Sequence, residues 1–411
     1  MSQITQAELN RILKEHQDFL KGISGGVRAS VKFRDLTGLD FRRANLVNAD
    51  FSGSCLNETN LSHCKCSNAS FFACDLNKAN LSHGDFARCD FRGASIVNAD
   101  LTEANFDSAD LRRGVMMNYL DAASEDKWNK SGETKLSGSM VRDTDMSHIL
   151  AHNTNFSDAN MVGVKMHDAR LNGSDLSNAN MQNADLSGTN LTGANMKNAV
   201  VDGIILTAVE GDRTEIAGLI EQQNARKSLK DGDMDLKALI KEHTSWIQSA
   251  GRDGQQLNLS EYDLSDEKDL RNYPLTVIVA SGSKFTGLYL EGVKMESSVL
   301  NRSDFRDCHM KNADFRGSSF KESLFTRADL SNASFSALKV KRPDGSEMLQ
   351  SVDLSQSRMA FAILDGANFS NANLQDVDFS HASLKNCDFS NCNLKGASFE
   401  DADLEGTTLP E

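Results

Sequence analysis

The sequence predicts an all-β solenoid, a chain that coils repeatedly around one axis. Three observations support this fold class. From Phe41 to Met116 every fifth residue is apolar, apart from a single Cys66 that fills the same place. Two positions before the apolar residue stands a small one, as Ala49 precedes Phe51. The place between them is often Asp or Asn, as at Asp50.

A period of five fits neither the 3.6-residue period of an α-helix nor the two-residue period of a plain strand. It fits a short extended piece followed by a corner, because residues two apart face the same side of an extended segment. Asp and Asn favour turns by bonding to nearby backbone. A chain that bends the same way at every repeat must coil, and each coil needs its neighbour to bury its apolar residues.

Phenylalanines also recur at intervals of twenty residues, which favours four repeats in each coil. Like residues would then stack in columns along the axis, with coils about 4.8 Å apart, the spacing of hydrogen-bonded strands. The two clearest columns are Phe51, Phe71 and Phe91, and Phe285, Phe305 and Phe325.

The repeat A-[DN]-[LF]-x-x resembles the consensus of the pentapeptide-repeat proteins, and this resemblance covers most of the chain. It implies a right-handed quadrilateral β-helix with the Leu, Phe and small residues pointing inward. It also implies a protein for which an enzymatic activity is not expected.

Composition sets further bounds. The 411 residues carry a net charge of −14, and only 39% are hydrophobic. Such a balance is typical of disorder, but the strict period outweighs it, because a narrow solenoid needs only two apolar places in five. No stretch of about 18 apolar residues would span a membrane, and the N-terminus lacks the pattern of a signal peptide. We therefore expect a cytoplasmic protein.

The eight cysteines do not form a metal-binding or disulfide pattern. Six occupy the small inward place, Cys66 occupies the large inward place, and only Cys55 faces outward. We expect the inward cysteines to act as small hydrophobic residues. No CxxC pair is present, so the sequence predicts no zinc site.

Helices are predicted at the start of each half of the chain. Thr5 and Glu8 form a capping box for an amphipathic helix over residues 5–21. Residues 239–247 repeat the pattern of residues 12–20, which predicts a second helix of the same kind. A solenoid end exposes its core and unpaired strand edges, so both helices are expected to act as caps.

The domain organisation follows as a tandem duplication of cap and β-helix. The expected parts are an N-terminal helical cap over 1–28, a first β-helix over 29–206, a helical linker with the second cap over 207–254, and a second β-helix over 255–411. The linker also contains a capping box at Asp212 and Glu215. Two separately capped solenoids are favoured over one continuous rod, although the sequence leaves both open.

Two excursions interrupt the repeats, and they are the expected sites of protein contact. The first covers residues 117–135, and the second is a tight hairpin over residues 341–351. The candidate protein-contact residues are Tyr119, Trp128, Arg342 and Asp344. For Trp128, packing of its own loop is as strong an interpretation as a contact with a partner.

No motif predicts a catalytic residue, a cofactor or a metal. His16 and His243 stand at matching places in the two helices, which favours packing or hydrogen bonding over acid–base chemistry. His63 and His83 are twenty residues apart and are expected to stack about 5 Å apart in an outward column. A solvated column is favoured there over a shared metal.

The sequence therefore predicts a non-enzymatic, rigid scaffold for an unknown protein partner. The acidic balance argues against direct nucleic-acid binding. The resemblance adds an alternative, a DNA-mimicking protein that binds DNA gyrase and protects it from quinolones. The strongest acid excess lies in residues 351–411, with 10 acids against 3 bases. A third hypothesis is that the protein is an effector delivered into host cells, for which the sequence shows no recognisable targeting signal.

The last predicted coil has no helix after it, so its apolar side is expected to pair with a second copy of the chain. The candidate dimer end comprises Phe399, Leu404 and Leu409.

Overall fold

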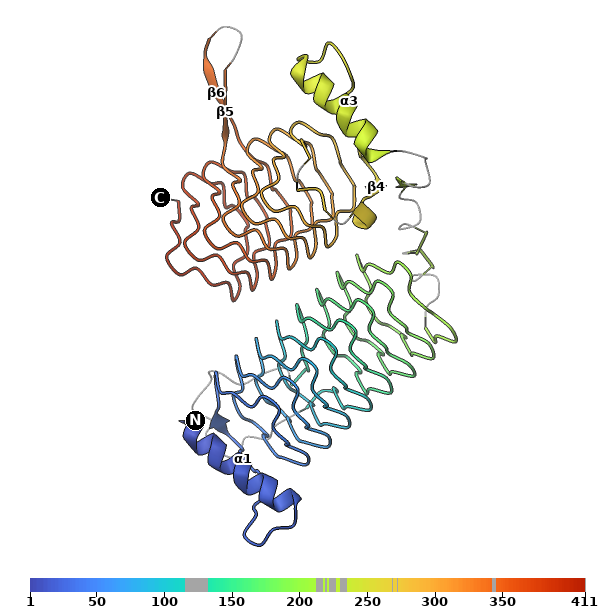
Figure 1. Cartoon of the computed structure of the whole chain (residues 1–411), viewed down its shortest axis with the longest axis vertical. Coiled ribbons are helices and arrows are strands. Elements are labelled where there is room, and N and C mark those ends of the chain that lie inside the picture. Colours follow the sequence, from blue (N-terminus) through green and yellow to red (C-terminus); the bar gives the residue numbers. More distant parts are fainter. Residues whose placement is uncertain are drawn as a thin grey trace. The chain divides into compact units, whose positions relative to one another are not determined.

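The chain folds into two compact units, Met1–Gln223 and Asn224–Glu411, in the computed structural model (Figure 1). Each unit is a four-sided β-solenoid, a β-helix built of stacked coils. The structure describes residues 1–114, 132–211, 217–218, 220–221, 227–229, 235–267, 269–271, 273–341 and 345–410.

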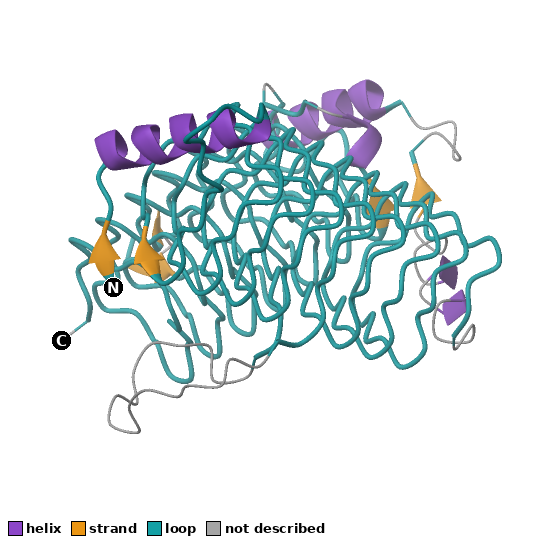
Figure 2. Ribbon diagram, turned by 90° about the horizontal axis from the view of Figure 1, so that it is seen from below, coloured by secondary structure: helices purple, strands orange, loops and turns teal. Residues whose placement is uncertain are grey.

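One residue on each side of a coil pairs in parallel with the residue twenty positions later, as Asp50 pairs with Ser70. The amide of Asp50 donates back to the carbonyl of Ala29 (3.0 Å), and the amide of Phe51 donates forward to the carbonyl of Ser70 (2.8 Å). Each contact is a single bridge, so most of the chain is drawn as loop in Figure 2. The predicted register of four repeats per coil is confirmed.

The corner after each inward residue has a fixed backbone conformation. The Oδ1 of Asp50 accepts the amide of Ser52 at 3.1 Å, which is the turn role predicted for this place. The second corner residue then takes a positive φ, as Asn48 (φ 62°) and Asn68 (φ 60°) do. Asn tolerates this left-handed conformation better than most residues, and the sequence analysis had assigned no role to this place.

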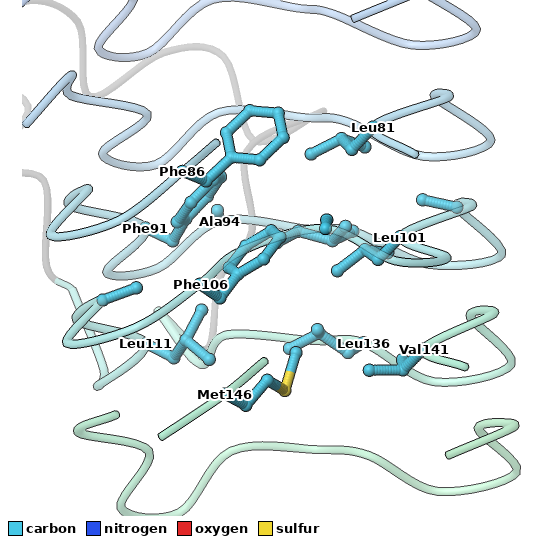
Figure 3. Packing of buried hydrophobic residues seen from close by; sticks show 14 of the residues in the cluster. Leu81, Phe86, Phe91, Ala94, Leu101, Phe106, Leu111, Leu136, Val141 and Met146 are labelled. Carbon is cyan, nitrogen blue, oxygen red and sulfur yellow. The ribbon is translucent and has the colours of Figure 1, made fainter. Parts of the chain in front are cut away.

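The core of each unit is a stack of the predicted inward residues. Phe71 lies on Phe51 with ring centroids 5.3 Å apart, and Phe91 lies on Phe71 at 4.9 Å. Figure 3 shows Leu111 below Phe91 in this column, and a neighbouring column of Phe86, Phe106 and Met146. Buried Phe, Leu and Met side chains thus occupy most of the axis, and their burial is the main favourable term for the fold.

The small inward residues allow the walls to approach closely and often bond across coils. The Sγ of Cys64 donates to the carbonyl of Phe41 at 2.9 Å, and Ser54 bonds in the same way to Val31 at 2.7 Å. All eight cysteines are free. Burial raises the pKa of the Cys89 thiol to about 12, so this inward thiol stays protonated near neutral pH.

Both predicted N-terminal helices form. Helix α1 covers Gln6–Leu20 with Thr5 as its N-cap and the predicted capping box with Glu8, and helix α3 covers Leu236–Gln248 with Asp235 as its N-cap. A two-residue strand precedes each helix and pairs in parallel with the first coil that follows. Strand β1 (Ser2–Gln3) pairs with β2 (Arg34–Asp35), and β3 (Lys227–Ser228) pairs with β4 (Tyr262–Asp263). The predicted capping box at Asp212 and Glu215 lies outside the described residues.

The first excursion leaves and re-enters the solenoid without disturbing its register. Ser95 pairs with Lys135, forty residues later, so exactly two coil lengths separate these neighbours in the stack. The base closes where the amide of Gly114 donates to the carbonyl of Gly132 at 2.7 Å.

The second excursion is an antiparallel hairpin of β5 (Leu338–Lys341) and β6 (Glu347–Gln350). It begins three residues before the predicted start at residue 341. Ser319 pairs with Asp353 across it. We call residues 338–350 the projecting hairpin (Figure 1).

The first coil of the second unit is less regular than the other coils. Asn258 pairs with Val279 at an interval of 21 residues, so one residue is inserted in this coil. A short 3₁₀ helix, η2 (Ser265–Glu267), lies at the second corner. This insertion explains why the repeat pattern restarts imperfectly after Leu259.

A strained corner residue in this coil gives a test of the turn. Val277 has a φ of 56°, which is unfavourable for a β-branched side chain. Replacing Val277 with Asn should raise the free energy of unfolding by about 1 kcal/mol, because Asn adopts this conformation at lower cost. The unfolding midpoint in urea measures the change. Val299→Asn, at a bridging position with no positive φ, is the control; an equal gain there would contradict the strain argument.

Candidate interaction surfaces

The predicted protein-contact residues are not placed by the structure. Tyr119, Trp128, Arg342 and Asp344 all lie outside the described residues, so their role stays a prediction. The parts of the excursions that the structure does describe are the base of the first and the two strands of the second.

The projecting hairpin presents apolar side chains to solvent. Leu349 is 54% exposed and Met348 is 36% exposed. In the antiparallel register Leu349 lies opposite Lys339, and Met348 lies opposite Val340. The hairpin is anchored at its base, where the Nε2 of Gln350 donates to the carbonyl of Gly317 at 2.5 Å. Exposed apolar side chains on a strand pair held away from the core are suitable for a protein contact.

The sequence analysis missed Leu349 and Met348. They stand in a break of the five-residue pattern, where periodicity assigns no side chain to the inside or the outside. The only available indication was two adjacent apolar residues within a charged hairpin segment.

The predicted dimer end is an open coil. Phe399 and Leu404 are half-buried, and Leu409 is 53% exposed. Across the described part of this coil, the amides of Leu394, Phe399 and Leu404 have no hydrogen-bond partner. One coil earlier, the matching amides donate forward: Leu374 to Asn393, Phe379 to Ser398 and Leu384 to Asp403. We call the coil of Leu394, Phe399, Leu404 and Leu409 the open end.

In each unit the preceding strand and helix bond to the first coil. In the first unit, the Gln6 side chain accepts the amide of Asp40 and donates to its carbonyl, both at 2.9 Å. The amide of Ile4 donates to the carbonyl of Asp35 at 2.9 Å. Leu9 of α1 is fully buried in the core cluster of this unit. Groups that would otherwise be unpaired at this edge are thus satisfied within the chain.

The structure describes all four histidines that the sequence analysis discussed. His16 and His243 are fully buried and bond to the backbone of the first coil in their units. His63 and His83 stack with ring centroids 4.8 Å apart, and the Nδ1 of His83 lies 3.2 Å from Glu103. No group of three His, Cys, Asp or Glu side chains in the described residues is arranged to hold a metal ion.

Many surface carboxylates are paired within one corner. Where Asp precedes the inward residue and Arg follows it, the two side chains meet, as Asp90 and Arg92 do at 2.8 Å. Arg271 in this arrangement lowers the pKa of Asp269 to about 2. At Asp185 a hydrogen bond from Ser187 is the largest cause of a pKa lowered to about 2. The same pairing joins Asp40 to Arg42, Asp110 to Arg112, and Asp314 to Arg316.

This Asp-x-Arg pairing was visible in the sequence as a repeated pattern, but it was not interpreted as an ion pair. The pattern is absent from residues 351–411, because none of their three bases follows an Asp at this spacing. Arg358 instead pairs with Asp378 of the next coil.

In the described residues, neither α1 nor α3 has both the length and the apolar composition needed to cross a bilayer.

Comparison with protein families matches the chain to pentapeptide repeats, with eight copies. The matched residues amount to more than half of the chain and occur in both units: 27–62, 74–113, 169–207, 283–321, 308–339, 349–380 and 372–409. No curated protein matches the chain.

Solved structures with similarity to the chain include three pentapeptide-type proteins. One is QnrB1, a plasmid-mediated fluoroquinolone resistance protein (15% identity, 48% of this chain and 92% of that one, TM-score 0.29). Another comes from the Arabidopsis thaliana thylakoid lumen (28% identity, 30% and 72% covered, TM-score 0.24). A third is HetL of Nostoc sp. strain PCC 7120, involved in heterocyst differentiation regulation (16% identity, 96% and 95% covered, TM-score 0.14). These scores are too low to support a functional argument.

Proposed function

Because the chain belongs to the pentapeptide-repeat family, we propose that it is a non-enzymatic scaffold that binds a protein partner through its excursions. The observation that carries this proposal is the projecting hairpin, where Leu349 (54% exposed) and Met348 (36% exposed) lie apart from the core. The rest of the repeat surface supports it, because its polar side chains are engaged in turns and ion pairs rather than grouped as reactive sites. We expect Tyr119 and Trp128 of the first excursion to contact a protein partner as well.

We further propose that α1 and α3 are the N-terminal caps of the two solenoids. The support is the set of bonds from Gln6 and His16 to the first coil of one unit, and from His243 to that of the other. A rigid scaffold needs such caps, since an uncovered strand edge pairs with other chains.

The scaffold proposal can be tested by removing the hairpin within the register of the solenoid. Deleting residues 338–351 joins Ala337 to Val352, so that Phe335, Val352 and Leu354 again follow the five-residue pattern. We expect this variant to fold and to lose the partner captured by the full chain, as measured by quantitative mass spectrometry of material bound from the native host. Deletion of residues 114–133 should do the same for the first excursion, because it joins Arg113 to Thr134 in the same phase.

A point variant separates contact from folding. Leu349→Lys should weaken capture of the partner at least tenfold, whereas Ile363→Lys, at a residue 44% exposed on a repeat surface, should not. Equal capture by the full chain and both deletion variants would contradict the proposal.

The second candidate is binding to DNA gyrase by imitation of DNA, as the family resemblance suggested. The observation in its favour is the uncompensated acid excess of residues 351–411, 10 acids against 3 bases. If this candidate is correct, the protein should inhibit supercoiling by gyrase, and replacing exposed Asp376 and Asp401 with Asn should reduce the inhibition. A supercoiling assay that shows no effect at excess protein would exclude it.

We also propose that two copies associate through the open end. Unpaired amides and the exposed Leu409 side chain are the support, since both gain partners if two such coils meet. Leu404→Lys and Leu409→Lys should convert a dimer to a monomer in light scattering at micromolar concentration, while Leu349→Lys should leave the mass unchanged. A monomeric full chain would contradict this proposal.

A further inference from the structure

One buried histidine in each unit holds the N-terminal helix against the first coil. His16 on α1 and His243 on α3 follow the same Lys-Glu pair, at Lys14–Glu15 and Lys241–Glu242. Both side chains are fully buried. Their rings stack on an aromatic residue three positions later, with centroids 6.0 Å apart for His16 and Phe19 and 5.9 Å apart for His243 and Trp246.

The two imidazoles make the same bond. The Nδ1 of His16 lies 3.0 Å from the amide nitrogen of Ala29, and the Nδ1 of His243 lies 3.0 Å from that of Leu257. A backbone amide can only donate, so both Nδ1 atoms are acceptors and carry no proton. Each ring is therefore neutral with its proton on Nε2. In the second unit this Nε2–H donates to the carbonyl of Thr276 at 3.0 Å.

We propose that His16 and His243 are acid-sensitive latches that release the helices from the first coils when their Nδ1 atoms become protonated. Protonation turns the acceptor into a donor that faces another donor, so the bond that joins helix to coil is lost. The helix then leaves the strand edge that it covers, which includes the amides of Ala29 and Leu257. This inference rests on the capping role proposed above.

The charged groups around the rings do not favour the protonated form. Arg28, in the segment between α1 and the first coil, lies close enough to His16 to disfavour a second positive charge. On α1 itself, Glu15 points to Arg11, with the two side chains 3.8 Å apart. No charged group in the described residues shifts His243, for which burial is the largest effect. A protonated ring would thus find no compensating carboxylate at either site.

The direction of the pH effect follows from these surroundings. Burial lowers the pKa of both histidines below the ordinary value of 6.5. At a pH between the folded pKa and 6.5, the unfolded chain therefore binds more protons than the folded chain. The stability that the latches contribute is complete above pH 6.5 and falls as pH drops through the folded pKa. Asp35 and Asp40 of the first coil have pKa values below the usual range, so they stay ionised in this interval.

Not every histidine loses its contribution to stability on acidification. His148 is held by Asp107 at 2.7 Å, which raises its pKa. Its contribution to stability is present below pH 6.5 and is lost as pH rises through its folded pKa. A loss of helix contact on acidification therefore cannot come from His148.

Hydrogen exchange of the full chain at pH 7.5 and pH 5.0 tests the proposal, with rates corrected for the intrinsic pH dependence. At pH 7.5 the Ala29 and Leu257 amides should be protected; their exposure at that pH would instead reject the capping role itself. At pH 5.0 we expect their protection to fall at least tenfold. The Asn60 amide, which donates to Leu39 within the first unit, is the internal control and should keep its protection.

The matched variants are His16→Asn and His243→Asn. The Oδ1 of Asn can accept the same amide bond but does not titrate, so these variants should keep the helix contact at both pH values. Loss of protection at pH 5.0 to the same extent in the double variant and the wild type would overturn the proposal.

A second measurement covers the case in which the Asn variants fail to fold. Nitrogen chemical shifts of the wild-type imidazoles should report the Nε2–H tautomer at pH 7.5 and a protonation step that coincides with the loss of amide protection. Protonation of both rings while Ala29 and Leu257 stay protected would also overturn the proposal.

Discussion

Parallel pairing at an interval of twenty residues is the constraint on which both solenoids depend. Each side of a coil contributes one bridging residue, such as Asp50, whose amide donates backward while the next amide donates forward. One bridge is far too little to stabilise an isolated strand. Stability therefore comes from repetition, as every coil satisfies the backbone of its neighbours and places another layer of buried side chains on the axis.

The twenty-residue register limits which insertions and substitutions the solenoid can accommodate. A long insertion leaves the stack and returns in phase, as the chain does between Ser95 and Lys135 and again between Ser319 and Asp353. The outward places between such insertions are largely occupied by turn-forming and ion-pairing residues, of which Asp90 and Arg92 are one example. The excursions and the ends of the stacks are therefore the places where we propose specific recognition.

The first and last coils of a solenoid each have backbone groups with no neighbouring coil to bond, and the two ends differ in how these groups are paired. At the N-terminal edges, bonds from Gln6, His16 and His243 satisfy first-coil backbone groups. At the open end the amide of Phe399 has no counterpart in the described residues.

Much of the fold could be predicted because the five-residue period is stronger than any local propensity. It placed Cys66 in the core and Cys55 outside it, and the capping box of Thr5 and Glu8 located α1. The positive φ of the second corner residue was missed, because Asn, Gly and charged residues share that place without one common chemistry. The extra residue between Asn258 and Val279 was missed for the same kind of reason, since a single insertion only blurs the period.

The candidate surfaces were harder to predict than the fold. Leu349 was overlooked because it lies where the five-residue period is interrupted. In a single repetitive sequence, only this period indicates whether a side chain points inward or outward. Gln6 was overlooked because its partner, Asp40, lies 34 residues away in the chain. Pairing of a side-chain amide with a strand edge depends on tertiary geometry that local patterns do not contain.

Deleting one complete coil tests the central claim most directly. Removing residues 156–175 joins Asn155 to Leu176 and keeps every column of the first unit in place. Removing residues 156–173 instead shifts all later residues by two places. The account predicts that the twenty-residue deletion folds with a cooperative urea transition and the circular dichroism of the full chain, whereas the eighteen-residue deletion loses the cooperative transition of its first unit. Equal behaviour of the two variants would contradict an axis built on a twenty-residue register.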